Sequence, residues 1–401
     1  MISRQPVHTV YGGAHLFKAH TARRLGERGL AALDEHGGPA EFTAAFGLDV
    51  DASLARSIRE RVGAKLRREP VEDFRIDFED GYGNRPDGEE DSHAVSAASE
   101  VARGHRERLL PPYIGIRIKP LGGELRERAI RTLDRFVSTL VEGAGEVPAG
   151  FVVTLPKITA VGQVSTLVDR LESLERGLKL ASGSLRLELM IETTESVLDS
   201  NGRCAIPALV EASRGRCRGA HFGTYDYTAS CQITAAHQHM THPSCDFAKL
   251  MMQVALASTS VWMSDGATNV LPIGDRATVH AAWRLHASHV RHSLVGGFYQ
   301  GWDLHPAQLP SRYAAVYAFF LEGLDAASTR LRNFVDKAAQ ATLVGEVFDD
   351  AATGQGLLNY FLRAMNSGAI TEEEAVDRSG LTLDELRSRS FAAILRGRKR
   401  S

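Results

Sequence analysis

The sequence predicts an α/β protein whose main unit is a (β/α)8 TIM barrel, followed by a C-terminal helical extension. Eight short apolar runs follow one another, and most of them end in polar residues. Helical periodicity fills most of the intervals between these runs. Strands that alternate with helices form right-handed βαβ units around a parallel sheet. An open, doubly wound sheet is the alternative. Against it, the first run is followed by Gly12 and Gly13 but by no glycine-rich phosphate loop.

The expected strands are short and apolar, as buried parallel strands usually are. They lie at residues 9–12, 74–78, 113–118, 151–155, 185–191, 219–222, 261–263 and 297–302. The first connection is too long for one helix, and its pattern predicts helices at residues 17–33 and 52–66. After the third strand, apolar residues recur every three or four positions between 125 and 140, which predicts another helix.

The strand pattern stops after about residue 325, and helical patterns follow. We expect helices at residues 329–343, 356–367, 371–379 and 382–395. Two of them start with a threonine followed by acidic residues, which is typical of an N-capped helix. The sequence therefore predicts two domains, a catalytic barrel at residues 1–325 and a helical domain at residues 326–401. The second domain has the length to act as a lid over its own barrel or a neighbour's, so we expect a homo-oligomer.

Composition and charge exclude several classes of partner. The chain has 401 residues, 43% of them hydrophobic, and a formal net charge of −2. This charge gives no electrostatic reason to expect nucleic acid or a membrane surface as a partner. No apolar segment is long enough to span a membrane, and the four cysteines show no Cys-x-x-Cys spacing. We therefore expect a cytoplasmic protein with reduced thiols.

Two acidic residues at the ends of consecutive expected strands indicate a metal site. Glu192 closes the fifth apolar run, and Asp226 lies shortly after the sixth. Neighbouring parallel strands are ~4.8 Å apart, so both carboxylates can reach one point at the carboxyl-end mouth of the barrel. Two hard oxygen ligands favour Mg²⁺, with Mn²⁺ as the other candidate. The alternative for both residues is a helix cap or a buried salt bridge.

The second strand ends in an acidic cluster. Asp77, Glu79 and Asp80 lie within four residues, and such carboxylates repel one another unless a cation neutralises them. The alternative for Glu79 and Asp80 is structural, either capping a loop or pairing with Arg75 or Arg85.

Three further strand ends carry polar residues that suit an anionic substrate. Arg117 lies at the end of the third strand, and its planar guanidinium matches a carboxylate. Lys157 follows the fourth strand, and His305 follows the eighth. The alternatives are an Arg117 that only balances the acidic cluster, a Lys157 that forms a structural ion pair, and a His305 that hydrogen-bonds the barrel rim.

Six segments at these strand ends carry a resemblance to a known family. They read FRIDFEDGYG, IGIRIKP, VVTLPKI, ELMIET, FGTYDYTAS and GGFYQGWDLHPAQL. These segments occur in the order seen in the HpcH/HpaI aldolase and citrate lyase β-subunit family. The sequence resembles this family across roughly residues 70–310. That superfamily of phosphoenolpyruvate/pyruvate-type barrels also includes malyl-CoA lyases. The segment GTYDYTAS is additionally similar to the metal-ligand segment of malate synthases.

The resemblance implies roles for individual residues. Glu192 and Asp226 match the family's two Mg²⁺ ligands. Arg117 matches the arginine that binds the carboxylate and oxo group of a 2-oxo acid or enolate. Glu79 and Asp80 match acidic residues that hold metal-bound water.

The resemblance also extends to residues expected near the substrate. Lys157 and His305 match motif positions with less settled roles, and we expect Lys157 to be catalytic. Gly223, Thr224, Tyr225 and His305 are expected to contact the substrate.

The function implied is that of a Mg²⁺-dependent carbon–carbon lyase or aldolase acting on a small 2-oxo or 2-hydroxy acid through a metal-stabilised enolate. The base is not identified. One candidate is a metal-bound water held by Glu79. Another is an aspartate of the C-terminal domain, as malate synthases use, with Asp349 and Asp350 as the obvious positions. We assign Asp350 to the catalytic set.

Two other functions stay open. One is condensation or cleavage of an acyl-CoA, as in malate synthase or malyl-CoA lyase, which would make a CoA thioester a partner. The other is a non-catalytic barrel that binds a dicarboxylate. The chain also departs from the family, because its first strand ends YGGAH instead of Val-Pro-Gly. His237, His239 and His242 after the sixth strand are either a second metal site or loop histidines that contact substrate.

Overall fold

Eight parallel strands form a barrel in the computed structural model, which describes residues 4–340 and 351–398. In chain order the strands are β1 His8–Gly13, β2 Asp73–Asp77, β3 Tyr113–Arg117, β4 Phe151–Leu155, β5 Arg186–Ile191, β6 Cys217–Phe222, β7 Trp262–Ser264 and β8 Gly301–Asp303. Their order in the sheet is β7-β6-β5-β4-β3-β2-β1-β8. Backbone hydrogen bonds from Asp265 N–H to Gln300 O (2.8 Å) and from Trp302 N–H to Gly266 O (3.0 Å) link the two outer strands. The expected (β/α)8 fold is confirmed.

Helices cover the outside of the barrel, as the periodicity predicts. They are α1 Thr21–His36, α2 Phe42–Phe46, α3 Ala52–Arg68, α4 Asp87–Glu107, α5 Arg126–Ala144, α6 Val161–Gly177, α7 Thr194–Val197, α8 Ile206–Ala212, α9 Thr224–Ser230, α10 Pro243–Leu256, α11 Arg276–Val295 and α12 Leu309–Glu322. Short 3-10 turns are η1 Ala14–Leu16, η2 Gly123–Leu125, η3 Ala235–His237 and η4 Pro306–Gln308. Within the described ranges, no helix is both long and apolar enough to cross a membrane.

Several boundaries differ from the expectation, and in the barrel the largest differences are at the starts of α1 and β8. The first helix was expected from residue 17 but begins at Thr21, because η1 takes up the preceding residues and Lys18 N–H donates to Thr21 Oγ1. The eighth strand was expected from residue 297 but begins at Gly301. Gly297 has a φ of +82°, so the backbone there turns instead of extending.

The chain after the barrel is helical. Its elements are α13 Leu324–Gln340, α14 Ala351–Ser367, α15 Glu372–Ser379, α16 Leu383–Arg387 and α17 Phe391–Arg398. The single helix expected at residues 382–395 is two helices. Arg389 adopts the left-handed conformation with a φ of +55°, and this breaks the helix between α16 and α17.

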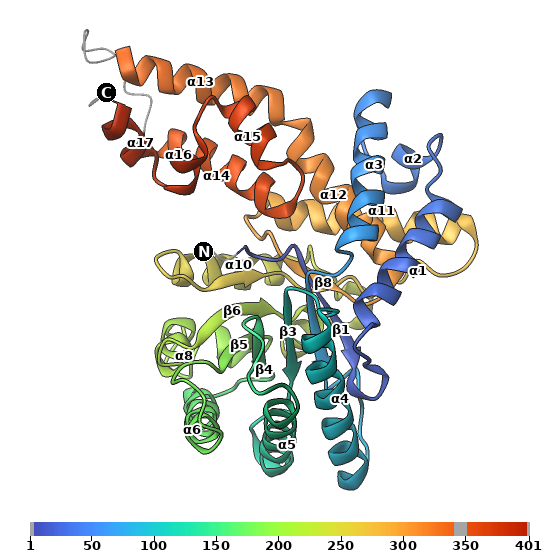
Figure 1. Cartoon of the computed structure of the whole chain (residues 1–401), viewed down its shortest axis with the longest axis vertical. Coiled ribbons are helices and arrows are strands. Elements are labelled where there is room, and N and C mark those ends of the chain that lie inside the picture. Colours follow the sequence, from blue (N-terminus) through green and yellow to red (C-terminus); the bar gives the residue numbers. More distant parts are fainter. Residues whose placement is uncertain (1–3, 341–350, 399–401) are drawn as a thin grey trace.

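The C-terminal helices lie beside the amino ends of the barrel strands (Figure 1). Arg363 of α14 donates to Gln5 Oε1 at 2.7 Å, just before β1, and Arg61 of α3 pairs with Glu374 of α15 at 2.5 Å. In the described residues the extension therefore lies at the end of the barrel opposite the carboxyl-end mouth. A lid over a neighbour's mouth, and the division into two domains, stay predictions.

A network of charges fills the barrel interior. Arg75 of β2 is fully buried, and its Nη2 lies 2.7 Å from both Asp73 Oδ2 and Glu188 Oε2. Glu188 of β5 also contacts His221 Nε2 at 3.1 Å. The cation thus joins strands from opposite parts of the sheet, and each buried carboxylate has a counter-charge.

Removing the cation from this network should destabilise the barrel. We expect Arg75→Met to lower the free energy of unfolding by about 3–5 kcal/mol, because it leaves two buried carboxylates without their partner. Urea titration followed by circular dichroism measures this change. Adding Glu188→Gln should restore part of the loss, whereas Arg135→Met on the exposed face of α5 should be nearly neutral. An Arg75→Met protein as stable as the parent would contradict the role of the network.

Candidate functional site

The carboxyl-end mouth of the barrel is organised by Arg117 and Asp77. Arg117 Nε and Nη2 donate to the two carboxylate oxygens of Asp77 at 2.7 and 2.5 Å. Asp77 also accepts hydrogen bonds from Glu79 N–H (3.0 Å) and Gly81 N–H (2.7 Å), which fold the loop after β2 back over the strand end. The bidentate pair uses most of the guanidinium, so Arg117 Nη1 is the nitrogen left facing the mouth.

Glu79 and Asp80 contact the cations of neighbouring strands. Arg117 Nη1 lies 3.0 Å from Glu79 Oε2 and 3.7 Å from Asp80 Oδ2. Lys157 Nζ donates to Glu79 and lies 3.3 Å from Asp80 Oδ2. The alternative partners named above are engaged elsewhere, because Arg75 lies in the barrel interior and Arg85 pairs with Glu89.

Lys157 stands in the middle of the carboxylates. Besides its contacts to the loop after β2, its Nζ lies 3.3 Å from Asp226 Oδ2 in the first turn of α9. Burial alone would lower the pKa of the Lys157 ammonium, but Glu79 and the other carboxylates raise it above the ordinary value. Lys157 also has a φ of +47°, a conformation that non-glycine residues rarely adopt. Its charge therefore balances acidic residues from three different strands.

Glu192, just after β5, is buried next to this lysine. Its Oε1 accepts a hydrogen bond from Lys157 N–H at 2.6 Å. Burial raises the pKa of the Glu192 carboxyl to about 7, although Arg117 acts to lower it and Asp226 adds to the increase. Gly223 makes room for this side chain, since a Cβ at position 223 would lie 2.5 Å from Glu192 Cβ and Oε2. Gly223, expected to contact substrate, is thus required by the position of Glu192.

The donor set at the mouth fits a divalent cation. Carboxylates that follow β2 and β6 contact the Lys157 ammonium, and Glu192 after β5 binds the backbone N–H of the same residue. Several carboxylate oxygens close together are the ligands a hard cation prefers. Burial is the main cause of the raised pKa of Glu192, and a cation bound beside it would favour the ionised carboxylate. Yet no three His, Cys, Asp or Glu side chains of the described ranges already form a metal site. A metal ion would have to take the place of Lys157 Nζ among these carboxylates.

Two aromatic residues that the sequence did not identify lie behind Arg117. The rings of Tyr11 and Trp302 stack with centroids 4.3 Å apart. Arg117 Cζ lies 4.9 Å from the Tyr11 centroid and 5.9 Å from that of Trp302. Both rings cover this side of the guanidinium and stabilise its positive charge through cation–π contacts. The position of Tyr11, directly before two glycines at a strand end, was the available signal.

The segment after β6 is fixed by the loop after β7. Tyr225 Oη donates to Ala267 O at 3.0 Å and accepts from Asn269 N–H at 2.9 Å. Thr224 Oγ1 is buried and has no hydrogen-bond partner among the described residues. Tyr225 is therefore a positioning residue in this state, and Thr224 keeps a free hydroxyl.

The candidate histidines have structural contacts. His305 caps η4, with its Nδ1 accepting from Ala307 N–H at 3.2 Å. His242 caps α10 and His239 Nδ1 contacts Thr241 Oγ1 at 3.0 Å. His237 ends η3. None of them belongs to a metal-binding cluster of the described residues.

Asp349 and Asp350, proposed as bases, lie outside the described residues. A catalytic role for Asp350 stays a prediction.

Comparisons with known proteins agree with the fold. A citrate lyase from Burkholderia xenovorans LB400 superposes with a TM-score of 0.57 at 20% identity, covering 80% of this chain and 91% of that one. The native malate synthase of Haloferax volcanii gives a TM-score of 0.51 at 14% identity, covering 95% of this chain and 96% of that one. Its pyruvate/acetyl-CoA ternary complex gives 0.50 at 14% identity, covering 98% and 97%. At these identities the likeness concerns the fold alone.

The family assignment comes from the sequence. No protein with a curated description matches the chain. A family model described as "Domain of unknown function (DUF6986)" matches residues 1–394, almost the whole length. The chain therefore belongs to the DUF6986 family.

Proposed function

We propose that this protein is a Mg²⁺-dependent carbon–carbon lyase or aldolase that acts on a small 2-oxo or 2-hydroxy acid, related to the HpcH/HpaI and citrate lyase β-subunit enzymes. The observation that carries the proposal is the arrangement of four carboxylates around Lys157, beside the guanidinium of Arg117. Glu79, Asp80 and Asp226 contact the Lys157 ammonium, and Glu192 accepts from the Lys157 backbone N–H. The fold shared with a citrate lyase and a malate synthase supports it.

Glu192 and Asp226 would hold the cation, with Glu79 and Asp80 close enough to bind its outer ligands. A bound divalent ion supplies positive charge for the enolate that forms when a bond next to a carbonyl breaks. Once displaced from the centre of the carboxylates, the Lys157 ammonium is free to pair with the carboxylate of a substrate.

Arg117 contributes a fixed charge at the same place. Asp77 holds two of its nitrogens, so the guanidinium cannot turn away from the mouth. Nη1, which contacts Glu79 at 3.0 Å, is the nitrogen that would bind an enolate or carboxylate oxygen. Such preorganised positive charge lowers the cost of developing negative charge. The aromatic rings of Tyr11 and Trp302 keep water from this side of the site.

One screen of substrates distinguishes the proposed lyase from the two alternative functions, an acyl-CoA enzyme and a dicarboxylate-binding protein. The purified chain is incubated with 2-oxo and 2-hydroxy acids, with and without acetyl-CoA, while pyruvate, glyoxylate and free thiol are followed. Pyruvate or glyoxylate release without CoA supports the lyase. Free thiol release shows an acyl-CoA reaction, and tight binding without turnover shows a binding protein.

The first test is metal dependence. We expect EDTA to abolish turnover and Mg²⁺ or Mn²⁺ to restore it, because the site carboxylates cannot stabilise an enolate without a cation. Glu192→Gln and Asp226→Asn should each lower kcat/KM more than a hundredfold. Glu195→Gln, an exposed glutamate three residues along, is the matched control and should retain parental activity. Full turnover by metal-free protein would rule out the proposed mechanism.

The second test uses the titration of Glu192. Its folded pKa of about 7 lies above the ordinary value of 4.5, so the folded state binds this proton more tightly than the unfolded chain. The stability that the group contributes is present below pH 4.5 and is lost as the pH rises through 7. In EDTA, Glu192→Gln should therefore gain stability relative to the parent between pH 5 and 8, by roughly 2–3 kcal/mol.

Chemical denaturation at several pH values measures this difference. Mg²⁺ should reverse it, since it stabilises the parent most at pH 8, where the carboxylate is ionised. A difference between the two proteins that does not vary with pH would show that Glu192 is not the titrating group.

The third test concerns Arg117. Arg117→Lys keeps the charge but loses the two-point grip on Asp77, so the cation no longer has a fixed direction. We expect kcat/KM to fall by an amount equivalent to about 1–3 kcal/mol, mainly through kcat. Steady-state kinetics with the best substrate of the screen provide the measurement. Parental kinetics in this variant would make Arg117 structural.

A further inference from the structure

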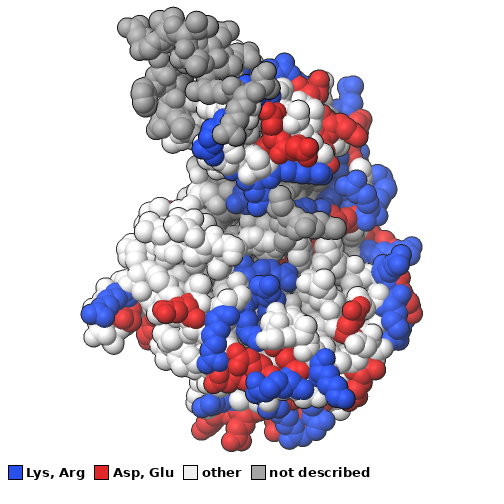
Figure 2. All heavy atoms as spheres, turned by 60° about the vertical axis from the view of Figure 1, so that its left-hand side comes forward, with Lys and Arg blue, Asp and Glu red and all other residues white. Residues whose placement is uncertain are grey.

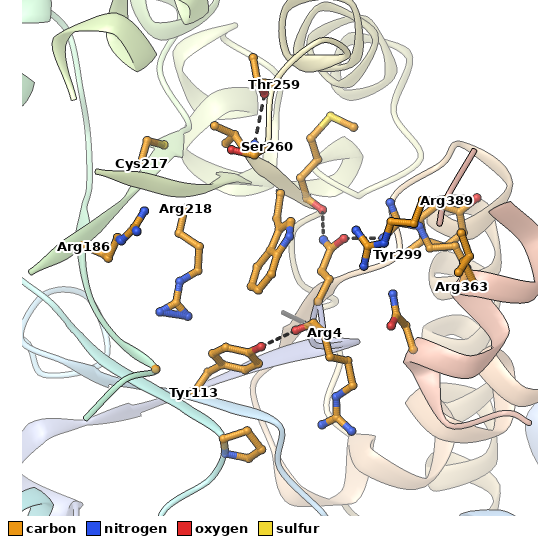
Figure 3. A pocket seen from close by; sticks show the side chains of 18 of the residues that line it. Arg4, Tyr113, Arg186, Cys217, Arg218, Thr259, Ser260, Tyr299, Arg363 and Arg389 are labelled. Atoms are coloured by element: carbon orange, nitrogen blue, oxygen red, sulfur yellow. Dashed lines mark hydrogen bonds between the residues drawn. The ribbon is translucent and has the colours of Figure 1, made fainter. Parts of the chain in front are cut away.

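A cavity with a volume of about 1040 Å³ lies at the amino ends of the barrel strands, opposite the candidate active site. One wall comes from the starts of strands, where Tyr113, Arg186 and Trp262 lie. The other wall comes from the C-terminal helices, with Arg363 of α14 (Figure 3). Asn359 of α14 also lines it. The proposed enzyme function does not use this cavity.

The lining is strongly basic. Five arginines take part, namely Arg4, Arg186, Arg218, Arg363 and Arg389. Among the described lining residues Glu69 is the only acid, and it is already paired with Arg4 at 2.9 Å and Lys65 at 2.5 Å. Figure 2 shows Lys and Arg side chains gathered around the hollow between the C-terminal helices and the barrel. The cavity therefore carries an excess of positive charge, although the chain as a whole has a formal net charge of −2.

The guanidinium of Arg218 lines the cavity and forms no ion pair with a carboxylate of the described residues. It lies over the ring of Tyr113, 5.0 Å from the centroid (Figure 3). It also lies over the ring of Trp262, 5.7 Å from the centroid. No acidic side chain of the described ranges lies within 4 Å of it. Burial lowers the pKa of Arg218 below its ordinary value, despite the more distant Glu188 and Asp73.

Arg363 repeats this arrangement on the opposite wall. Its guanidinium lies 4.4 Å from the centroid of Tyr299, and its Nη1 donates to the neutral Gln5 Oε1 at 2.7 Å. Burial lowers its pKa, and the like charge of Arg389 lowers it further. In the described part of the chain it forms no ion pair with a carboxylate.

These two residues differ from the most deeply buried arginines of the described structure. Each of those is paired with a carboxylate: Arg75, Arg117, Arg128, Arg216 and Arg312. Arg218 and Arg363 are half-buried, and removing part of a guanidinium from water without a counter-charge costs free energy. Two such residues facing one cavity from two parts of the fold mark a place where an anion supplies the missing partner.

We propose that this cavity binds a small organic polyanion, with phosphate or carboxylate groups that reach Arg218 on the barrel wall and Arg363 on the wall formed by α14. The volume suits a metabolite of nucleotide size, since ligand pockets span roughly 300–1,000 Å³. The aromatic rings beside both arginines offer contact to the body of the ligand. The ligand joins the barrel to the C-terminal helices and stabilises their packing.

The test uses the full chain in EDTA and low salt, so that metal-assisted binding at the mouth does not contribute. ATP, inorganic pyrophosphate and citrate are the probes, and adenosine is the uncharged control. Binding is followed by the fluorescence of Trp262 and by titration calorimetry. We expect at least one polyanion to bind saturably, with an affinity that falls as salt is added, while adenosine does not bind. Pyrophosphate or ATP alone would identify a phosphate site, and citrate alone a carboxylate site.

Variants place the binding at the cavity. Arg218→Gln and Arg363→Gln should each weaken the bound polyanion about tenfold, and the double variant by more than either. Arg203→Gln removes the same charge from an exposed loop that does not line the cavity, and it should bind like the parent. Trp262→Phe should lose the fluorescence change while calorimetry still detects the ligand.

Stability gives an independent measurement on the same variants. Without added anion the double variant should melt at the parental temperature or above it, because it loses two uncompensated charges. With the polyanion only the parent and Arg203→Gln should gain stability. The proposal is overturned if none of the three polyanions binds at millimolar concentration, or if the arginine variants bind as tightly as the parent.

Discussion

The need of the most deeply buried guanidinium groups for a carboxylate organises the barrel interior and its mouth. In the barrel interior Arg75 joins Asp73 and Glu188, so distant strands share one counter-ion. At the mouth the same pairing links Arg117 to Asp77 and folds the loop after β2. A barrel interior with charges tolerates few alternative registers, because a one-residue slip would leave a charge without its partner. Strand ends, and with them the site residues, are thereby held in place.

The two ends of the barrel carry an excess of opposite charge. At the carboxyl end, acidic residues exceed the cations near them, and the Lys157 ammonium stands in their centre. At the amino end, arginines exceed the acids. A nearly neutral chain thus carries a strong internal separation of charge along the barrel axis, which total composition cannot reveal.

The fold could be predicted because the hydrophobic periodicity and the lengths of the apolar runs are local properties of the sequence. Buried runs near Glu192 and Asp226 identify strands, and polar residues at their ends identify the mouth. The central position of Lys157 could not be predicted, since it depends on a left-handed backbone conformation that no sequence pattern indicates. The arginine cavity was missed because its residues come from strand starts and from α14, which are far apart in sequence. The break between α16 and α17 was missed for the same reason as the position of Lys157. It depends on a positive φ at Arg389, a conformation that an arginine rarely adopts.

The close approach of Gly223 to Glu192 has an evolutionary consequence. A methyl group at position 223 would occupy the space of the glutamate side chain, so Gly223 cannot change while Glu192 keeps its position. Homologues that keep the glutamate should therefore keep the glycine. A lineage that replaces the glycine marks the point at which the chemistry of the mouth was abandoned, even where the barrel itself survives.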